Sequence, residues 1–153
     1  RPMDEDYDKN FGFLIHDVAR LMRIAHDRRM RPLGLTRSQW WVINHVYFHP
    51  GISQTNLARL LDVGRATLGR LLDRLEAKEW IYRRPDENDS RIKRVYLSET
   101  IGPLLQTMRF EAKRTLDSSL SCLSEKEQSE LFTLLYRIKT ELSISNDGES
   151  EHE

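Results

Sequence analysis

Two short leucine-rich segments separated by three residues constrain the fold more than any other feature of this sequence. Residues 54–61 carry apolar side chains on one face, and residues 65–78 carry four leucines at three- and four-residue steps. The connecting run Asp62-Val63-Gly64 has the composition of a tight turn, and Ser53 is a plausible N-cap for the first segment. Two short helices joined by such a turn are what a helix-turn-helix requires, so we predict one here.

A β-prone region follows this pair of helices. Residues 81–84 and 93–97 are short runs that favour strands, and residues 85–91 between them are dense in turn formers. This pattern predicts a β-hairpin with a charged tip. A helix-turn-helix followed by such a hairpin is a winged helix-turn-helix, and we predict this domain over residues 36–98.

Helical periodicity flanks the predicted domain on both sides. A helix is expected over residues 8–31, and a second begins after Thr36 and ends at about residue 47. After Ser98 a new helix is expected to start near Pro103, and Ser124 followed by Glu127 is a capping-box pattern that opens the last one. The predicted fold class is therefore mainly α with a small β-hairpin wing.

The flanking helices are long relative to the core that they could cover. We expect residues 8–33 and 99–145 to form one discontinuous dimerisation region, because two-fold homodimers are the commonest way to bury such apolar stripes. Residues 146–153 are acidic and polar, and we expect them to form a disordered tail.

The charge is unevenly distributed along a chain whose net charge is zero. Residues 59–98 contain 10 Lys and Arg against 7 Asp and Glu, whereas residues 99–153 contain 6 against 11. A basic middle and an acidic C-terminal third suit a protein with one face toward phosphate and the other away from it.

Several function classes find no support in the sequence. We find no metalloprotease motif, no Cys-x-x-Cys pair, no glycine-rich phosphate loop, no nucleophile elbow and no metal-ligand spacing among the histidines. We therefore expect no enzyme, no cofactor and no metal.

No apolar run reaches the ~18 residues of a membrane span, and no signal-peptide pattern opens the sequence. The sequence has a single cysteine, Cys122, so no intrachain disulfide can form, and we expect the protein in a reducing cytoplasm. We expect Cys122 itself to be a small hydrophobic side chain that is buried or half-buried.

The start of the second helix of a helix-turn-helix contacts base edges in the major groove. Five residues are predicted to face outward there: Arg65, Ala66, Thr67, Gly69 and Arg70. Arginine can bind guanine through two hydrogen bonds, threonine can contact a thymine methyl group or a phosphate, and small residues let the backbone come close. The alternative is that the two arginines are ordinary solvated helix residues.

The hairpin tip presents Asp89 and Arg91, followed by Lys93. An arginine beside a recognition helix can enter the minor groove of A·T-rich DNA, and Asp89 could brace it by a charge-assisted hydrogen bond. The alternative is a generic polar hairpin.

These residues together resemble the MarR family of bacterial transcription regulators. Residues 56–63 are similar to the first helix of the family's motif, residues 66–76 to its recognition helix, and Asp89-Ser90-Arg91 with residues 95–98 to its wing signature. The similarity covers about residues 10–142, and residues 19–40, which include Trp40, look closest to the SlyA-like branch. One departure is Glu79, where many members have glycine. Glu79 must then either take a left-handed conformation or end the helix differently.

The resemblance implies a triangular homodimer that binds double-stranded DNA, with one winged motif on each half-site of a pseudo-palindromic operator. It also implies a repressor, with a ligand-independent activator or anti-silencing regulator as the alternative and a protein-binding winged helix as a weaker one. By position, the candidate phosphate contacts are Ser38, Gln39, Ser53, Gln54 and Thr55.

Family members often bind small anionic aromatics in a cleft beside the dimerisation helices. By position, Arg20, Arg23 and Trp40 could line such a cleft and respond to an aromatic or anionic effector, with His16 and His45 as weaker candidates. The alternative is that Trp40 belongs to the core, and that Arg20 and Arg23 form surface or intra-dimer pairs.

Overall fold

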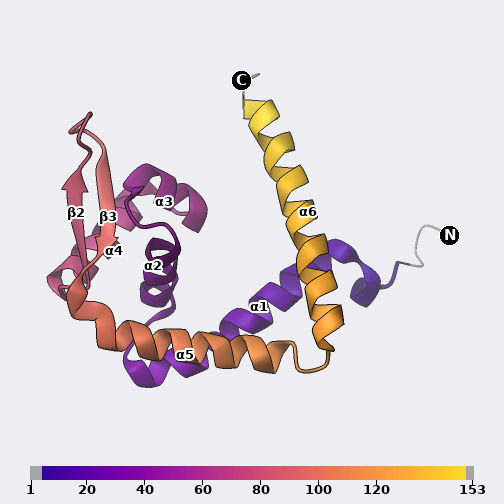
Figure 1. The fold of residues 1–153 in the computed structure, drawn as a ribbon. Helices are drawn as coiled ribbons and strands as arrows, with labels where there is room; N and C mark the ends of the chain where they lie inside the picture. Colours follow the sequence, from indigo (N-terminus) through magenta and orange to yellow (C-terminus); the bar gives the residue numbers. More distant parts are fainter. Residues whose placement is uncertain (1–4, 151–153) are drawn as a thin grey trace. The chain divides into compact units, whose positions relative to one another are not determined.

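The computed structural model describes residues 5–150 and divides the chain into two units, one that runs to Thr115 and one that starts at Leu116. The predicted order of helices and hairpin is confirmed, as Figure 1 shows. The main elements are α1 (Phe11–Met30), α2 (Arg37–Phe48), β1 (Ile52–Ser53), α3 (Gln54–Leu61), α4 (Arg65–Ala77), β2 (Ile81–Pro85), β3 (Lys93–Leu97), α5 (Gly102–Ser119) and α6 (Glu125–Ser150). Short 3₁₀ helices lie at Tyr7–Lys9, Arg31–Leu33 and Glu99–Ile101.

The predicted caps start the helices where the sequence places them. The Thr36 hydroxyl accepts a hydrogen bond from the Gln39 amide, and the Gln39 side chain accepts one from the Thr36 amide, which completes a capping box at α2. The Ser53 hydroxyl accepts from the Asn56 amide at 3.1 Å and begins α3. Ser124 and Glu127 form the same reciprocal pair at α6. Each cap satisfies backbone N–H groups that a helix cannot satisfy itself.

The two tight helix ends use residues other than glycine. Asp62 takes the left-handed conformation at the end of α3, with φ at 55°, whereas Gly64 is extended and caps α4. Glu79 is also left-handed, with φ at 60°, and this settles the alternatives for the end of α4 in favour of the strained backbone. Aspartate tolerates this region better than most residues, but a glutamate there is costly.

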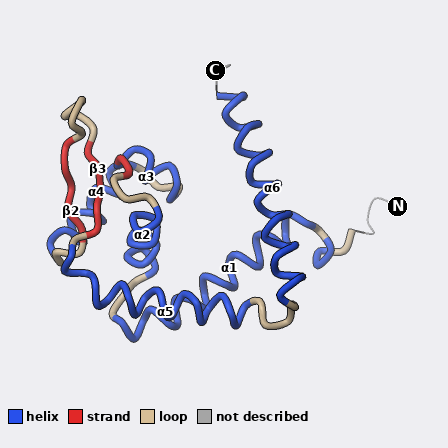
Figure 2. The backbone as a smooth tube through the Cα atoms, in the orientation of Figure 1, coloured by secondary structure: helices blue, strands red, loops and turns tan. Residues whose placement is uncertain are grey.

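The wing is a three-stranded antiparallel sheet and not a hairpin alone. β2 pairs with β3 over the predicted strands, with Ile81 opposite Leu97 and Pro85 opposite Lys93. The two-residue strand β1 pairs with the other edge of β3, with Ile52 opposite Val95 (Figure 2). β1 was not predicted from the sequence, because a two-residue strand is too short to show any periodicity.

One apolar core joins the helix-turn-helix to the sheet. Its fully buried members include Ile43 of α2, Leu57 of α3, Leu72 of α4 and Val95 of β3. The flanking segments add Met30 at the end of α1, Ile101 of the 3₁₀ helix before α5, and Met108 within α5. The recognition helix is therefore held by packing on the side opposite to its exposed arginines.

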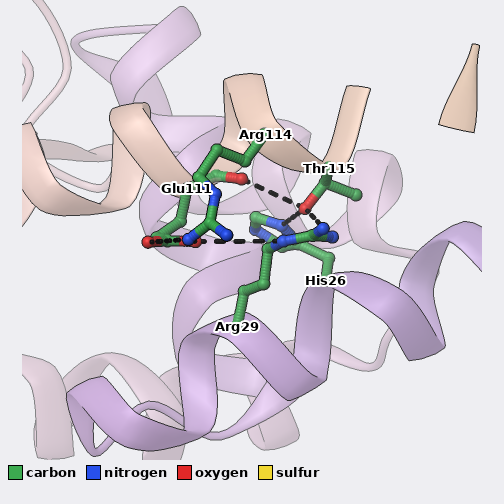
Figure 3. A network of polar contacts seen from close by, with 5 residues as sticks. All are labelled: His26, Arg29, Glu111, Arg114 and Thr115. Atoms are coloured by element: carbon green, nitrogen blue, oxygen red, sulfur yellow. Dashed lines mark hydrogen bonds and ion pairs between the residues drawn. The ribbon is translucent and has the colours of Figure 1, made fainter. Parts of the chain in front are cut away.

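A polar cluster joins α1 to α5 within the first unit (Figure 3). The Thr115 hydroxyl donates to the Glu111 carbonyl at 3.1 Å and accepts from Arg29 at 3.2 Å. It also lies 3.0 Å from Nδ1 of His26, within hydrogen-bond distance. Burial lowers the pKa of His26, which lies edge-on against the Trp40 ring.

Two expectations about the C-terminal part are wrong. α6 runs through Ser150, so residues 146–150 are helical and not disordered, because the helix continues past the last apolar residue of its stripe; residues 151–153 lie outside the described residues. Cys122 is exposed and not buried, because it lies in the turn between α5 and α6. Among the described helices, none is both long enough and apolar enough to cross a bilayer.

Candidate nucleic-acid interface

Residues from three separate elements meet around one shallow hollow of about 210 Å³. The lining residues are Ser53, Gln54 and Thr55 at the start of α3, Arg65 at the start of α4, and Arg91, Ile92 and Lys93 in the wing. All but Ile92 belong to the candidate residues predicted from the sequence. The helix N-termini add the partial positive charge of their unpaired N–H groups to that of the three basic side chains. The hollow is therefore suited to hold an anionic backbone.

The first two turns of α4 present the remaining candidates on the open side of the helix. Arg65, Ala66, Thr67 and Arg70 are exposed, while Leu68, Leu72 and Leu75 point into the core. The predicted orientation of this helix is therefore confirmed. The Arg70 guanidinium lies 3.5 Å from the Thr67 hydroxyl, which is at the limit of a hydrogen bond and leaves its donors available.

Gly69 lies in the same turn and has no packing partner. A Cβ atom added there would meet nothing within 4 Å. Glycine in a helix interior costs about 1 kcal/mol relative to alanine, and no contact within the chain requires it here. The open space at Gly69 is compatible with close approach by another molecule.

The predicted brace at the wing tip is confirmed. The Arg91 side chain donates to both carboxylate oxygens of Asp89 at 3.0 Å, and the Arg91 amide donates to the same group at 3.1 Å. These hydrogen bonds from Arg91 hold the pKa of Asp89 below its ordinary value. The Arg91 side chain remains 88% exposed, so it is oriented without being buried.

Two arginines in the sheet have structural roles that were not predicted from the sequence. Arg83 of β2 donates to Glu76 of α4 at 2.8 Å and also contacts Asp73, so it ties the wing to the recognition helix. Arg94 of β3 donates to Asp86 at 2.6 Å and to the Gly51 carbonyl at 2.9 Å. Charge alone does not distinguish these arginines from Arg91, because their partners are distant in sequence.

The other two phosphate candidates lie at the start of α2. Ser38 is exposed, and Gln39 is half-buried with its side-chain oxygen engaged in the capping box. Neither lines the hollow. Gln39 thus keeps only its amide N–H₂ group for an outside contact.

The candidate effector residues are not brought together. Trp40 is 3% exposed, and its indole N–H donates to Asp27 at 2.7 Å, which supports the alternative that it belongs to the core. Arg20 and His16 are exposed on α1, each 3.6 Å from Asp17. Arg23 is half-buried on the same helix. His45, the other weak candidate, is half-buried, with Nδ1 2.8 Å from the Trp41 carbonyl.

Comparisons with known proteins agree with the geometry. The model of the MarR family matches residues 33–92, which span α2, the helix-turn-helix and the wing as far as the turn before β3. The crystal structure of the transcriptional regulator SlyA is 32% identical with a TM-score of 0.71, and the match covers 86% of this chain and 92% of that one. The transcriptional regulator PA3341 is 31% identical with a TM-score of 0.79, over 88% of this chain and 98% of that one.

A structure with bound DNA is among the similar ones. A mutant of MarR from E. coli in complex with operator DNA is 25% identical, with a TM-score of 0.70, and the match covers 88% of this chain and 99% of that one. All the lining residues of the hollow except Lys93 lie within residues 33–92, which the family model matches.

Proposed function

Since the chain belongs to the MarR family of transcription regulators, which are not enzymes, we propose that it binds double-stranded DNA sequence-specifically, as a homodimer on a pseudo-palindromic operator. The observation that carries the proposal is the hollow in which α3, α4 and the wing gather their polar and basic side chains. Because chromosomal DNA lies in the cytoplasm of a bacterial cell, the proposal also places the protein there.

The recognition helix reads the major groove in this proposal. Arg65 and Arg70 can each donate two hydrogen bonds to guanine, and Thr67 can contact a thymine methyl group or a phosphate. Their exposure and the buried leucines behind them support this assignment. Ala66 and the unpacked Gly69 let the helix backbone come close to the groove.

The wing and the start of α3 complete the contact. The braced Arg91 enters the minor groove, where a narrow A·T-rich segment has an enhanced negative potential. Phosphates bind to Lys93, to Ser53, Gln54 and Thr55 at the α3 N-terminus, and to Ser38 and Gln39 at the α2 N-terminus. Such phosphate contacts fix the register of the protein on the duplex, whereas base contacts select the sequence.

The dimer is supported by apolar side chains that the single chain leaves exposed. On α1 these are Phe11, Phe13, Leu14, Ile15, Val18 and Leu21, and on α6 they are Phe132, Leu134, Tyr136, Ile138, Leu142 and Ile144. So many large apolar side chains exposed on two helices are unusual for a monomeric protein. A second copy that covers them would present two recognition helices, and hence two half-sites.

Repression is the proposed outcome of operator binding, with release by a small anionic aromatic as its regulation. The effector candidates that remain open are Arg20, Arg23 and His16, since the indole of Trp40 is buried and partnered. A ligand-independent activator is the competing outcome of the same binding.

Footprinting on the DNA upstream of the protein's own gene tests the proposal. We expect two protected half-sites about one helical turn apart, with protection lost on addition of an aromatic acid such as salicylate. Protection that persists at saturating acid would refute ligand release, and transcription from the protected promoter in vitro separates repression from activation. The proposed function itself would be refuted if no half-site is protected on this DNA and if selection from a random-sequence library yields no bound duplex.

A further inference from the structure

Arg94 stands two residues after Ile92 in a basic stretch that also contains Arg91 and Lys93. Judged by charge and position alone, it would be a third DNA contact of the wing. Its geometry indicates otherwise, because its guanidinium is engaged on both sides by groups of the protein.

The first partner is Asp86, at the other end of the wing turn. Nε of Arg94 donates to one carboxylate oxygen of Asp86 at 2.6 Å. The second carboxylate oxygen accepts from the backbone amides of Asn88 at 3.0 Å and Asp89 at 3.1 Å. Asp86 is only 14% exposed, and the hydrogen bond from Arg94 lowers its pKa, so the carboxylate stays ionised at neutral pH. The pair therefore fixes the backbone that carries Asp89 and its brace to Arg91.

The second partner is the carbonyl of Gly51, which Nη1 of Arg94 reaches at 2.9 Å. Gly51 directly precedes β1, and its own amide donates to the Val95 carbonyl at 3.0 Å. Two residues later, Ser53 begins α3. Arg94 thus connects the turn that bears Arg91 with the strand that leads to the α3 N-terminus, the two sides of the hollow.

We propose that Asp86 and Arg94 act as a positioning pair, which sets the wing tip against the start of α3 so that Arg91 and the α3 N-terminus engage one duplex together. This inference rests on the proposed function and names a determinant of its affinity. Arg94 itself leaves the phosphates to Lys93 and the helix N-termini.

The two roles of Asp86 predict opposite signs for one substitution. An acidic residue near DNA repels phosphate, so its neutralisation on electrostatic grounds alone should tighten binding slightly. If Asp86 positions the wing, Asp86→Asn should instead weaken binding, because the amide group replaces a charge-assisted hydrogen bond with a weaker or mismatched one. Glu87, the exposed neighbour in the same turn, supplies the matched control.

The experiment measures duplex affinity of the full-length protein by fluorescence anisotropy from 50 to 300 mM salt, with variants Asp86→Asn, Glu87→Gln, Arg94→Lys and Lys93→Gln. We expect Glu87→Gln to bind as tightly as the parent or up to about threefold tighter. Asp86→Asn and Arg94→Lys should each bind about tenfold more weakly and keep the parent's salt slope, whereas Lys93→Gln should reduce that slope by about one.

The double variant with Asp86→Asn and Arg94→Lys should bind about as weakly as either single variant, because both remove the same contact. The inference is overturned if Asp86→Asn binds as Glu87→Gln does, or if Arg94→Lys keeps full affinity. If one of these two results is obtained while the unsubstituted protein binds DNA, the proposed function still holds. If the unsubstituted protein binds no duplex, the proposed function is refuted instead. Thermal unfolding of each variant checks that it is folded. If Asp86→Asn does not fold, Arg94→Lys, which keeps the positive charge, still tests the inference.

Discussion

Replacing Gly69 with alanine separates what this residue does for the fold from what it does for DNA binding. The residue lies inside α4, and a Cβ atom there would meet nothing within 4 Å. The substitution should therefore stabilise the helix by about 1 kcal/mol, which is the difference in helix propensity between the two residues. For a chain of this size, that gain corresponds to a rise in Tm of about 2–4 °C.

The effect on DNA should have the opposite sign. If the backbone at Gly69 approaches the duplex closely, an added methyl group must displace DNA or helix, at a cost of about 1–3 kcal/mol in binding free energy. Thermal unfolding at fixed protomer concentration measures the first effect, and anisotropy with the footprinted duplex measures the second.

The reciprocal substitution Ala77→Gly, at the other end of α4, is the control. It should lower Tm and leave duplex affinity unchanged, since Ala77 lies outside the exposed first turns. A Gly69→Ala protein that is more stable and binds DNA as tightly as the parent would refute close backbone approach at this position. A less stable one would refute the claim that Gly69 has no packing partner.

Three further outcomes follow from the geometry. Glu79→Gly should stabilise the protein by about 1 kcal/mol, because it relieves the left-handed backbone. Lys78→Gly, at the neighbouring position where φ is −80°, relieves no such strain and should destabilise the protein in the same unfolding assay. Arg70→Ala should weaken operator binding by about 1–3 kcal/mol, and unchanged affinity would contradict the placement of the recognition helix. Arg91→Ala should mainly reduce the discrimination between A·T and G·C pairs in the DNA segment that contacts the wing. Because the pKa of His26 is lowered in the folded protein, the unfolded chain binds this proton at a higher pH than the folded chain does. The free energy of unfolding should therefore decrease as the pH falls from 6.5, the ordinary histidine pKa, to the lower pKa of the folded state. A His26→Gln protein with the same dependence of stability on pH would contradict this.

The parts of the fold that sequence predicted well are those determined by neighbouring residues. Thr36, Ser53 and Ser124 cap helices because a hydroxyl can reach amides two or three residues ahead, and this chemistry is local. The buried face of α4 follows from the spacing of its leucines. The same local chemistry identified Asp89 as the brace of Arg91.

The parts that escaped prediction depend on contacts between distant residues. β1 exists because Ile52 meets Val95, and a two-residue strand carries no pattern of its own. The partners of Arg94 lie at Asp86 and Gly51, so its position in a basic run gave no sign of an internal role. From the sequence, Trp40 could line a ligand cleft or belong to the core, and the structure favours the core by burying its ring and pairing its indole N–H with Asp27.

The salt dependence of duplex binding shows whether the hollow binds phosphates. If the hollow between α3, α4 and the wing holds the DNA backbone, log Kd for the footprinted duplex should rise steeply and linearly with log salt, because each phosphate contact releases condensed counterions. A duplex in which the half-sites are scrambled should bind at least a thousandfold more weakly at physiological salt. An affinity that stays flat from low to physiological salt, or that is the same for both duplexes, would rule out sequence-specific DNA binding through this hollow.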